Sequence, residues 1–326
     1  MSLQAHSITG RAVLVTGGCG FIGGHLVHGL LARGAARVVV VDSMRCGDPT
    51  NAKGASGSVE IVRFTLGTDP TARLVDALDG IDFVFHLAAE KHQAEADRPQ
   101  EILRANVEGT HQLLEAAVAR KVRKVVFASS LYTYGRMHGP PFREEDLPAP
   151  TTVYGLSKLA GEHLHAHFAA MYGLPYNVLR YLFVYGPRQF AGQGYKSVIV
   201  QSTERILAGL GPRVFGDGTQ ELDYVFVDDV VEASIRALEG AASGEIINIG
   251  SGTGTAVNRL VDTLISVSGC AMPKLYEPPD WTAGSSRIAD VAKARKLLGW
   301  TATTPLEVGL ARTFRWLARR SPSSQF

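Results

Sequence analysis

Three glycines, Gly17, Gly20 and Gly23, follow a short β-branched run and open a segment whose apolar residues recur at helical spacing. This order predicts a strand, a tight turn and a helix. Glycines in such a turn let the backbone approach a pyrophosphate and let the helix pack closely on the strand. The segment therefore predicts the start of an open α/β sheet, with a dinucleotide site at its first turn.

The alternation of strand and helix continues along the first part of the chain. Further apolar runs occupy residues 38–41, 59–64, 83–87, 125–128 and 177–180, and helical patterns occupy residues 71–78, 99–120 and 153–172. Continuously apolar strands are those covered on both faces, so we expect a parallel sheet. The pattern predicts a Rossmann-type, doubly wound sheet with right-handed crossovers.

After Arg180 the pattern becomes irregular and rich in turns. A strand is expected at residues 224–227, a helix at 228–238, a strand at 246–248 and helices between 290 and 316. We predict a smaller C-terminal α/β substrate lobe interleaved with the sheet. Residues 1–180 and about 224–250 would form the dinucleotide-binding domain, and about 181–223 and 251–326 the lobe.

Charge and cysteine content exclude several classes of protein. The chain has 326 residues and a formal net charge of +2, so nothing indicates a nucleic-acid groove or an anionic membrane surface. Cys19, Cys46 and Cys270 are too far apart for a disulfide framework or a metal site. Since no basic leader or spanning helix is evident, we expect a cytoplasmic protein without bound metal.

The choice of dinucleotide depends on Asp42, which ends the second predicted strand. Its carboxylate can accept hydrogen bonds from the adenosine ribose and would repel a 2′-phosphate, which favours NAD over NADP. Arg45 leaves NADP open, because its guanidinium could hold that phosphate or could be a solvated surface charge. Cys19, inside the glycine loop, is expected to fill space rather than to react.

Tyr154 and Lys158 lie four residues apart on one face of a predicted helix, and Ser130 ends a predicted strand. The carboxyl ends of strands are where open α/β sheets bind ligands. A phenol has an ordinary pKa near 10, and the positive charges of Lys158 and an oxidised nicotinamide would lower it. These residues predict removal of a proton and a hydride from an alcohol, with Ser130 hydrogen-bonded to its oxygen.

With these motifs the chain resembles the extended short-chain dehydrogenase/reductases, and within them the nucleotide-sugar epimerases and dehydratases. The likeness extends over nearly the whole chain, through residues 86–89, 106–110, 129–135, 180–188, 216–220, 223–230 and 293–300. It implies NAD-dependent epimerisation of a nucleotide-diphosphate sugar, at C4 through a transient 4-keto sugar. It also implies a homodimer formed by the two long helices, residues 99–120 and 153–172.

The resemblance also implies a set of binding residues. The NAD contacts it implies are Gly17, Gly20, Phe21, Ile22, Gly23, Asp42, Leu87, Ala88, Ala89, Lys91, Asn106, Ser129, Tyr154, Lys158 and Tyr181. Ser130, Tyr154 and Lys158 are the expected catalytic residues, and Lys91, Ser130 and Tyr132 are expected near the sugar.

Two positions bear on the type of reaction. Relatives that are dehydratases place an Asp-Glu pair after the catalytic hydroxyl, where this chain has Leu131 and Tyr132. A dehydratase is therefore disfavoured, and Tyr132 is either a second acid/base or a packing aromatic. A 4-ketoreductase that releases its cofactor is the main alternative, and a catalytically silent nucleotide sensor is a third.

Three positions depart from the usual nucleotide contacts: Thr65 in place of an Asp, Phe183 in place of an Asn, and Leu222 in place of an Arg. Losing a bidentate Arg removes charge-assisted hydrogen bonds to the diphosphate. Other cations must replace it, and the candidates are Arg188, Lys196, Arg213 and Arg287. Each of them could equally be a solvated surface charge. Phe183 itself is expected at the sugar, whereas Glu90 and His92 rank below Ser130 as catalytic groups.

Overall fold

The computed structural model describes residues 5–53, 58–91, 98–135, 139–189, 196–280 and 282–320. Its main sheet has seven parallel strands in the order β11-β6-β5-β4-β1-β2-β3. Their bounds are β1 Ala12–Thr16, β2 Arg37–Asp42, β3 Val59–Arg63, β4 Phe83–His86, β5 Lys124–Ser130, β6 Tyr176–Tyr181 and β11 Glu245–Ile249. Strand order reverses at β1, so the predicted doubly wound parallel sheet is confirmed.

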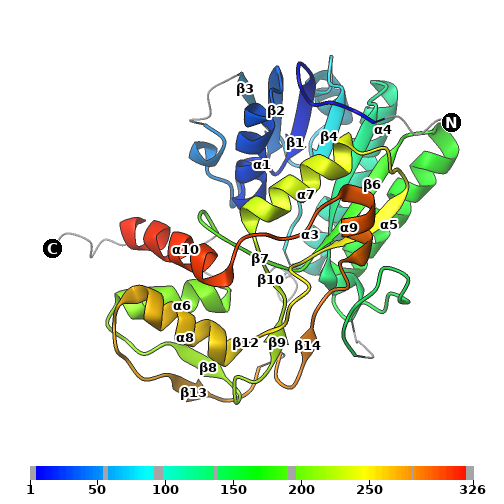
Figure 1. Ribbon diagram of the computed structural model, residues 1–326. Helices are drawn as coiled ribbons and strands as arrows, with labels where there is room; N and C mark the ends of the chain where they lie inside the picture. Colours follow the sequence, from blue (N-terminus) through cyan, green and yellow to red (C-terminus); the bar gives the residue numbers. More distant parts are fainter. Residues whose placement is uncertain are drawn as a thin grey trace.

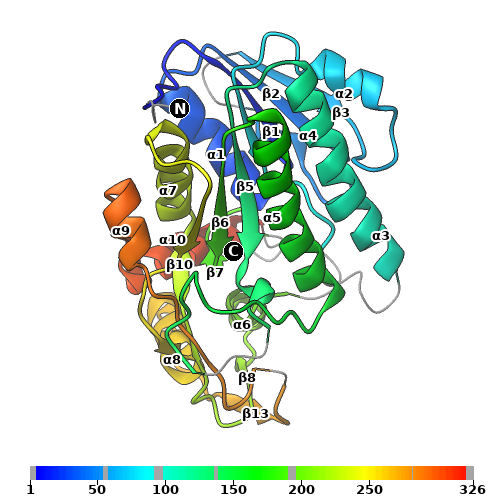
Figure 2. The same ribbon diagram turned by 90° about the vertical axis from the view of Figure 1, so that its right-hand side faces the viewer.

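Helices cover both faces of this sheet (Figures 1 and 2). On one face α1 (Phe21–Ala32) packs beside α7 (Val227–Glu239); on the other lie α2 (Thr71–Ala77), α4 (Gly109–Ala119) and α5 (Val153–Tyr172). The helix predicted over residues 99–120 consists of α3 (Pro99–Leu103), a π-helical turn (Arg104–Glu108) and α4. Single π turns within helices are frequent at functional sites.

A second apolar cluster lies below the sheet in Figure 1. It is built around α6 (Val198–Leu207), α8 (Val257–Ser268) and α10 (Leu306–Arg320). Three small sheets accompany it: β7 (Phe183–Tyr185) with β10 (Tyr224–Phe226), β8 (Arg213–Phe215) with β13 (Leu275–Glu277), and β9 (Glu221–Leu222) between β12 (Thr255–Ala256) and β14 (Ser286–Arg287). The remaining helix, α9 (Ala292–Leu298), packs on α7 and β11.

The sequence analysis did not predict α6 and α8. Both contain β-branched residues near their start, which locally favour strands, and their helical form depends on packing against each other and α10. The helices predicted between residues 290 and 316 are present as α9 and α10. The residue boundaries of the two predicted lobes stay a prediction.

The described residues hold neither a membrane-spanning helix nor a candidate metal cluster. Within the described ranges, no helix has both the length and the apolar character needed to cross a bilayer. In the same ranges, no three His, Cys, Asp or Glu side chains gather where they could hold a metal ion.

Candidate active site

The glycine loop between β1 and α1 leaves no room for a side chain at Gly17 or Gly23. Gly17 has φ +71°, and a Cβ there would lie 2.9 Å from the backbone nitrogen of Ala88. A Cβ on Gly23 would lie 2.1 Å from the carbonyl oxygen of Gly17. Gly20 caps α1 without a side chain that could accept the N–H groups of its first turn, which begins with Phe21 and Ile22. These N–H groups are therefore available to an anion, and the loop fits the pyrophosphate of NAD.

Asp42 is fixed at the carboxyl end of β2, next to the loop. It is 7% exposed, and its carboxylate accepts hydrogen bonds from the backbone nitrogens of Cys19 (3.0 Å) and Met44 (2.9 Å). Arg45 pairs with Glu90 at 2.9 Å and also with Glu101. Because two carboxylates hold this guanidinium, the geometry disfavours the alternative in which Arg45 binds a 2′-phosphate.

The thiol of Cys19 is buried, which fits the expectation that this residue fills space. Burial, assisted by the nearby carboxylates of Asp42 and Asp48, raises its pKa to about 12. A thiol that stays protonated is a poor nucleophile, so Cys19 packs in the core rather than reacting.

A buried chain of hydrogen bonds fixes the loop after β4. Thr16 Oγ1 accepts from the backbone nitrogens of Leu87 (3.1 Å) and Ala88 (3.0 Å) and lies 2.8 Å from His86 Nδ1. His86 Nε2 lies 2.9 Å from Thr110 Oγ1, which itself donates to the Asn106 carbonyl. The two threonine hydroxyls thus assign the Nε2–H tautomer, and burial, reinforced by Lys158, holds the pKa of His86 well below its ordinary value.

Asn106 connects this loop to the helix that carries Tyr154. Its side chain accepts from the Glu90 nitrogen (2.7 Å) and donates to the Glu90 carbonyl (2.9 Å) and to Ser157 Oγ (3.0 Å). Ser157 in turn donates to the Tyr154 carbonyl over 2.7 Å. Asn106 lies in the π-helical turn, so this turn places an amide between the loop and α5.

Ser130, Tyr154 and Lys158 come together where β5 ends beside α5. The Ser130 side chain lies close enough to the Tyr154 phenol to favour its ionised form, and Lys158 Nζ lies 5.8 Å from the centre of the Tyr154 ring. Lys158 Nζ also donates to the Ala128 carbonyl over 2.9 Å. The three residues predicted to be catalytic are therefore neighbours in space.

The charge states of these residues differ from the prediction. Burial raises the pKa of Tyr154 to about 12, although the Ser130 side chain opposes the shift. Burial also lowers the pKa of Lys158 to about 7, and Glu162 opposes that shift. The expected lowering of the phenol pKa by Lys158 is thus not found in the protein alone, where burial is the largest influence on Tyr154 and Lys158 is not among its causes. The predicted lowering of the phenol pKa also depends on the positive charge of the nicotinamide ring of oxidised NAD.

Ser129 is turned away from Ser130 into a buried ion pair. Its hydroxyl donates to Glu162 Oε1 over 2.5 Å, and Arg180 donates to the same carboxylate from Nε (2.9 Å) and Nη2 (2.7 Å). Tyr181 is also occupied, because its hydroxyl donates to Ser234 Oγ, whose own hydrogen goes to a backbone carbonyl. The hydroxyls of Ser129 and Tyr181 are thus already used within the protein.

A cavity of about 310 Å³ opens beside Ser130 and Tyr154. Of the predicted site residues it brings together Phe21, Ile22, Ser129, Ser130, Tyr132, Tyr154, Tyr181 and Phe183. The Tyr132 ring lies edge-on to the Tyr154 ring, with 5.6 Å between centroids, which fits the packing role weighed for it. Leu222, where the resemblance led us to look for an Arg, also lines this cavity.

Most of the predicted cations do not reach the cavity. Lys196 is paired with Glu204 at 2.8 and 2.7 Å, Arg213 with Glu277 at 3.3 Å, and Arg188 donates to the Asn51 carbonyl over 3.1 Å. Lys91 is exposed and does not line the cavity. His92 and the glycines of the predicted mobile loop, Gly192 and Gly194, lie outside the described residues.

Arg287 does not line the cavity either, but it lies directly behind its wall. It pairs through the backbone with Leu222 in the β14–β9 ladder, and it lies within electrostatic range of Tyr132 and Asp280. Burial lowers its pKa, while those two neighbours oppose the shift. Arg287 is therefore the predicted cation best placed to meet a bound anion.

Several polar residues of the cavity were missed by the sequence analysis: Gln189, Ser197, Gln220, Asp280 and Thr282. Gln220 Nε2 donates to the Phe215 carbonyl over 3.0 Å, whereas its Oε1 is buried without a hydrogen-bond partner in the described part of the chain. Ser197 caps α6, a helix we did not predict, with its hydroxyl accepting from Val200 N. Placing these residues required the fold of the second cluster.

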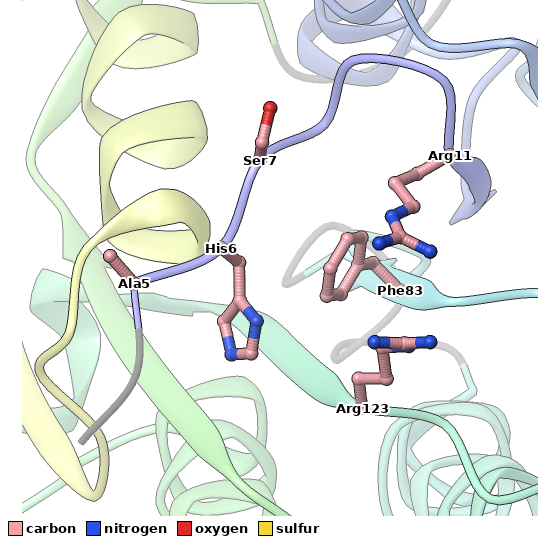
Figure 3. Close-up of a pocket in the computed structure, with 6 residues that line it drawn as sticks. All are labelled: Ala5, His6, Ser7, Arg11, Phe83 and Arg123. Carbon is pink, nitrogen blue, oxygen red and sulfur yellow. The ribbon is translucent and has the colours of Figure 1, made fainter. Parts of the chain in front are cut away.

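A smaller cavity, of about 160 Å³, lies at the opposite end of the sheet (Figure 3). It is lined by residues that precede or begin strands: Arg11 before β1, Phe83 at the start of β4 and Arg123 before β5. Asp82 pairs with Arg11 at 3.4 Å and with Arg123 at 2.9 Å, so both guanidinium groups already have a counter-ion. Ligands of open α/β sheets bind at the other edge, where Ser130 lies.

A dinucleotide loop at the end of β1, with Ser130, Tyr154 and Lys158 at the end of β5, defines an NAD-dependent enzyme acting on an alcohol. Residues 13–250 match the model of the NAD dependent epimerase/dehydratase family. The chain belongs to this family. The predicted NAD cofactor and extended short-chain dehydrogenase/reductase class are thereby confirmed.

Similar proteins cover almost the whole chain. A UDP-glucose 4-epimerase of Mycolicibacterium smegmatis is 35% identical over 316 residues, covering 94% of this chain and 99% of that protein. A Thermotoga maritima UDP-glucose 4-epimerase, solved with UDP-glucose, has a TM-score of 0.87 at 35% identity, covering 94% and 99% of the two chains. A Bacillus cereus UDP-glucuronic acid 4-epimerase, solved with NAD, has a TM-score of 0.85 at 30% identity, covering 94% and 99%.

Proposed function

We propose that this protein epimerises a nucleotide-diphosphate sugar at C4, using tightly held NAD. The observation that carries the proposal is that Ser130 and Tyr154 line the same cavity, with Lys158 Nζ 5.8 Å from the Tyr154 ring and residues Phe21 and Ile22 of the glycine-loop helix in the same lining. The similar proteins act on UDP-sugars according to their names, which supports the same substrate class here.

Each of the three residues has a separate task in this reaction. Ser130 donates to the oxygen of the C4 alcohol and holds it against Tyr154. Tyr154 takes the hydroxyl proton as a phenolate and returns it after the sugar has turned over. Lys158 would stabilise the phenolate in its protonated form, which a pKa of about 7 leaves partly populated at neutral pH, and Asn106 keeps the backbone of Tyr154 in place through Ser157. Bound NAD⁺ supplies the acceptor for the C4 hydride and, as NADH, its donor.

The glycine loop, Asp42 and the loop after β4 would hold the cofactor. The N–H groups at the start of α1 would bind its pyrophosphate, Asp42 would accept from its adenosine ribose, and Leu87, Ala88 and Ala89 would lie near its nicotinamide. Because Arg45 is already paired with two carboxylates, we propose NAD rather than NADP.

The purified protein tests this proposal against the 4-ketoreductase alternative. Denatured protein should release NAD, and UDP-glucose should be converted to UDP-galactose without added cofactor, as followed by proton NMR. Tyr154→Phe should abolish conversion, whereas Tyr276→Phe, an exposed tyrosine whose hydroxyl donates to Asn258, should not change it. Stoichiometric consumption of added NAD(P)H would instead identify a ketoreductase.

We also propose that the protein is a cytoplasmic homodimer formed through α3 and α5. Leu103 and Leu156 are 41% and 52% exposed on these helices, which contact each other within the chain. Apolar side chains exposed on adjacent helices suit burial against a second copy. Light scattering of the wild type and of Leu156→Glu tests this, because the substitution should convert dimers to monomers.

A further inference from the structure

The segment that follows β7 connects the cavity with the dinucleotide side of the molecule. Gln189 lines the cavity, and two residues earlier the Pro187 carbonyl lies 3.0 Å from His25 Nε2 on α1. Because a carbonyl can only accept, Nε2 carries the hydrogen of this bond. The Nδ1 atom of His25 lies 3.4 Å from Asp228 at the start of α7. The segment is therefore anchored to the helix that follows the glycine loop.

Arg188 lies between Pro187 and Gln189 and has an unusual backbone conformation. Its φ is +66°, in the left-handed region that a residue with a Cβ occupies rarely and at a cost. Its side chain is half-buried, and Nη1 donates to the Asn51 carbonyl over 3.1 Å. The same carbonyl accepts from His28 Nε2 on α1 over 3.0 Å. Strained residues persist where the surrounding contacts hold them, and they gather at functional sites.

Asn51 belongs to the loop that follows β2, and this loop packs on the glycine loop. Asn51 Nδ2 donates to the Cys19 carbonyl over 2.9 Å, and the backbone nitrogen of Asp48 donates to the same oxygen over 2.9 Å. The approach is close, since a Cβ on Gly47 would lie 2.8 Å from Asp42 Oδ1. The loop after β2 thus lies against Asp42 and Cys19, where the adenosine ribose and the pyrophosphate of NAD are expected.

We propose that Arg188 is a positioning residue for NAD retention, which acts through Asn51 to fasten the loop after β2 onto the glycine loop. We call the hydrogen-bonded series Arg188–Asn51–Cys19 the retention bridge. The inference rests on the proposed function, in which one NAD molecule must keep the C4 hydride until the sugar has turned over. The retention bridge slows the release of NAD during that interval. Arg188 is thereby assigned to the cofactor rather than to the sugar diphosphate.

Exchange of bound NAD measures retention directly. Protein loaded with radiolabelled NAD is mixed with a large excess of unlabelled NAD, and the label that stays on the protein is followed by rapid gel filtration. Arg188→Met keeps a long side chain but removes the donor, so it should exchange NAD roughly tenfold faster than the wild type, which corresponds to about 1.4 kcal/mol. Arg259→Met, on α8 with a side chain 68% exposed, should exchange NAD at the wild-type rate.

Equal exchange rates in Arg188→Met and the wild type would overturn the inference. The measurement requires no turnover, so it stays decisive if the proposed epimerisation fails. Conversely, a protein that exchanges NAD as expected but converts no sugar would keep the retention bridge and lose the proposed reaction.

Two further variants separate this role from a general loss of stability. Asn51→Ala removes the amide that reaches Cys19, so in that background Arg188→Met should accelerate NAD exchange by less than about threefold. A full tenfold effect there would mean that Arg188 does not act through Asn51. Arg188→Lys restores a cationic donor and should exchange NAD more slowly than Arg188→Met. Equal rates in the lysine and methionine variants would contradict the role of the hydrogen bond.

Discussion

Replacing Glu162 with Gln removes one charge from a buried ion pair directly behind the catalytic residues. The side chains of Arg180 and Glu162 are 1% and 3% exposed, and the guanidinium donates to both carboxylate oxygens. In Glu162→Gln the guanidinium is left without a counter-charge. Breaking a buried pair from one side costs about 3–5 kcal/mol, so for a chain of 326 residues we expect the Tm to fall by roughly 4–7 °C.

A matched control lies on the surface. Glu232 pairs with Arg33 at 2.7 Å and with Arg236 at 2.6 Å, but these side chains are 36–41% exposed. Glu232→Gln should therefore cost at most about 1 kcal/mol in a urea titration. The double variant Glu162→Gln/Arg180→Met should recover much of the loss, because it also removes the uncompensated guanidinium. Equal losses for Glu162→Gln and Glu232→Gln would refute the reasoning from burial.

Three further predictions concern single residues. Burial lowers the pKa of Lys158 in the folded protein to about 7, against an ordinary 10.5, so the unfolded chain binds more protons between these pH values. The free energy of unfolding of the wild type, relative to that of Lys158→Met, should therefore rise from pH 7 to 9.5. A difference that stays flat with pH would contradict the shift. Gly17→Ala should lower NAD affinity and stability more than Gly10→Ala does. Both glycines have φ above +70°, but only a Cβ at Gly17 meets other atoms. Equal effects of the two substitutions would mean that backbone strain alone, and not the close approach in the loop, is responsible. Thr16→Val leaves the Ala88 N–H without its acceptor, whereas the Leu87 N–H keeps the Thr16 carbonyl at 3.3 Å, so the substitution should cost about 1–3 kcal/mol. Thr263→Val, in a half-buried position of α8, should cost far less, and urea unfolding would reveal the difference.

The sheet could be predicted because its signals are local. The strands of the first part of the chain are mostly apolar, although β3 contains Glu60, and α1 and α5 begin and end where the spacing of apolar residues predicts. Ser130 could likewise be placed at the ligand-binding edge because it ends a strand, and the spacing of Tyr154 and Lys158 places both on one face of a helix.

The cavity wall could not be predicted in the same way. Asp280 and Gln220 lie far apart in the sequence, in short strands and turns whose positions depend on α6 and α8. The pKa of Tyr154 depends on how much of its surroundings is apolar, and sequence spacing supplies the distance to Lys158 but not the desolvation. The partner of Arg213 could not be predicted from the sequence either, because Glu277 reaches Arg213 through the pairing of β13 with β8.

The central claim is that a hydride leaves C4 of a nucleotide sugar and returns to the same carbon within one enzyme molecule. UDP-glucose carrying deuterium at C4, incubated with the purified protein in ordinary water without added cofactor, tests it most directly. NMR of the UDP-galactose formed should find the deuterium still at C4. Product with hydrogen at C4, or no product from protein that carries NAD, would contradict the account.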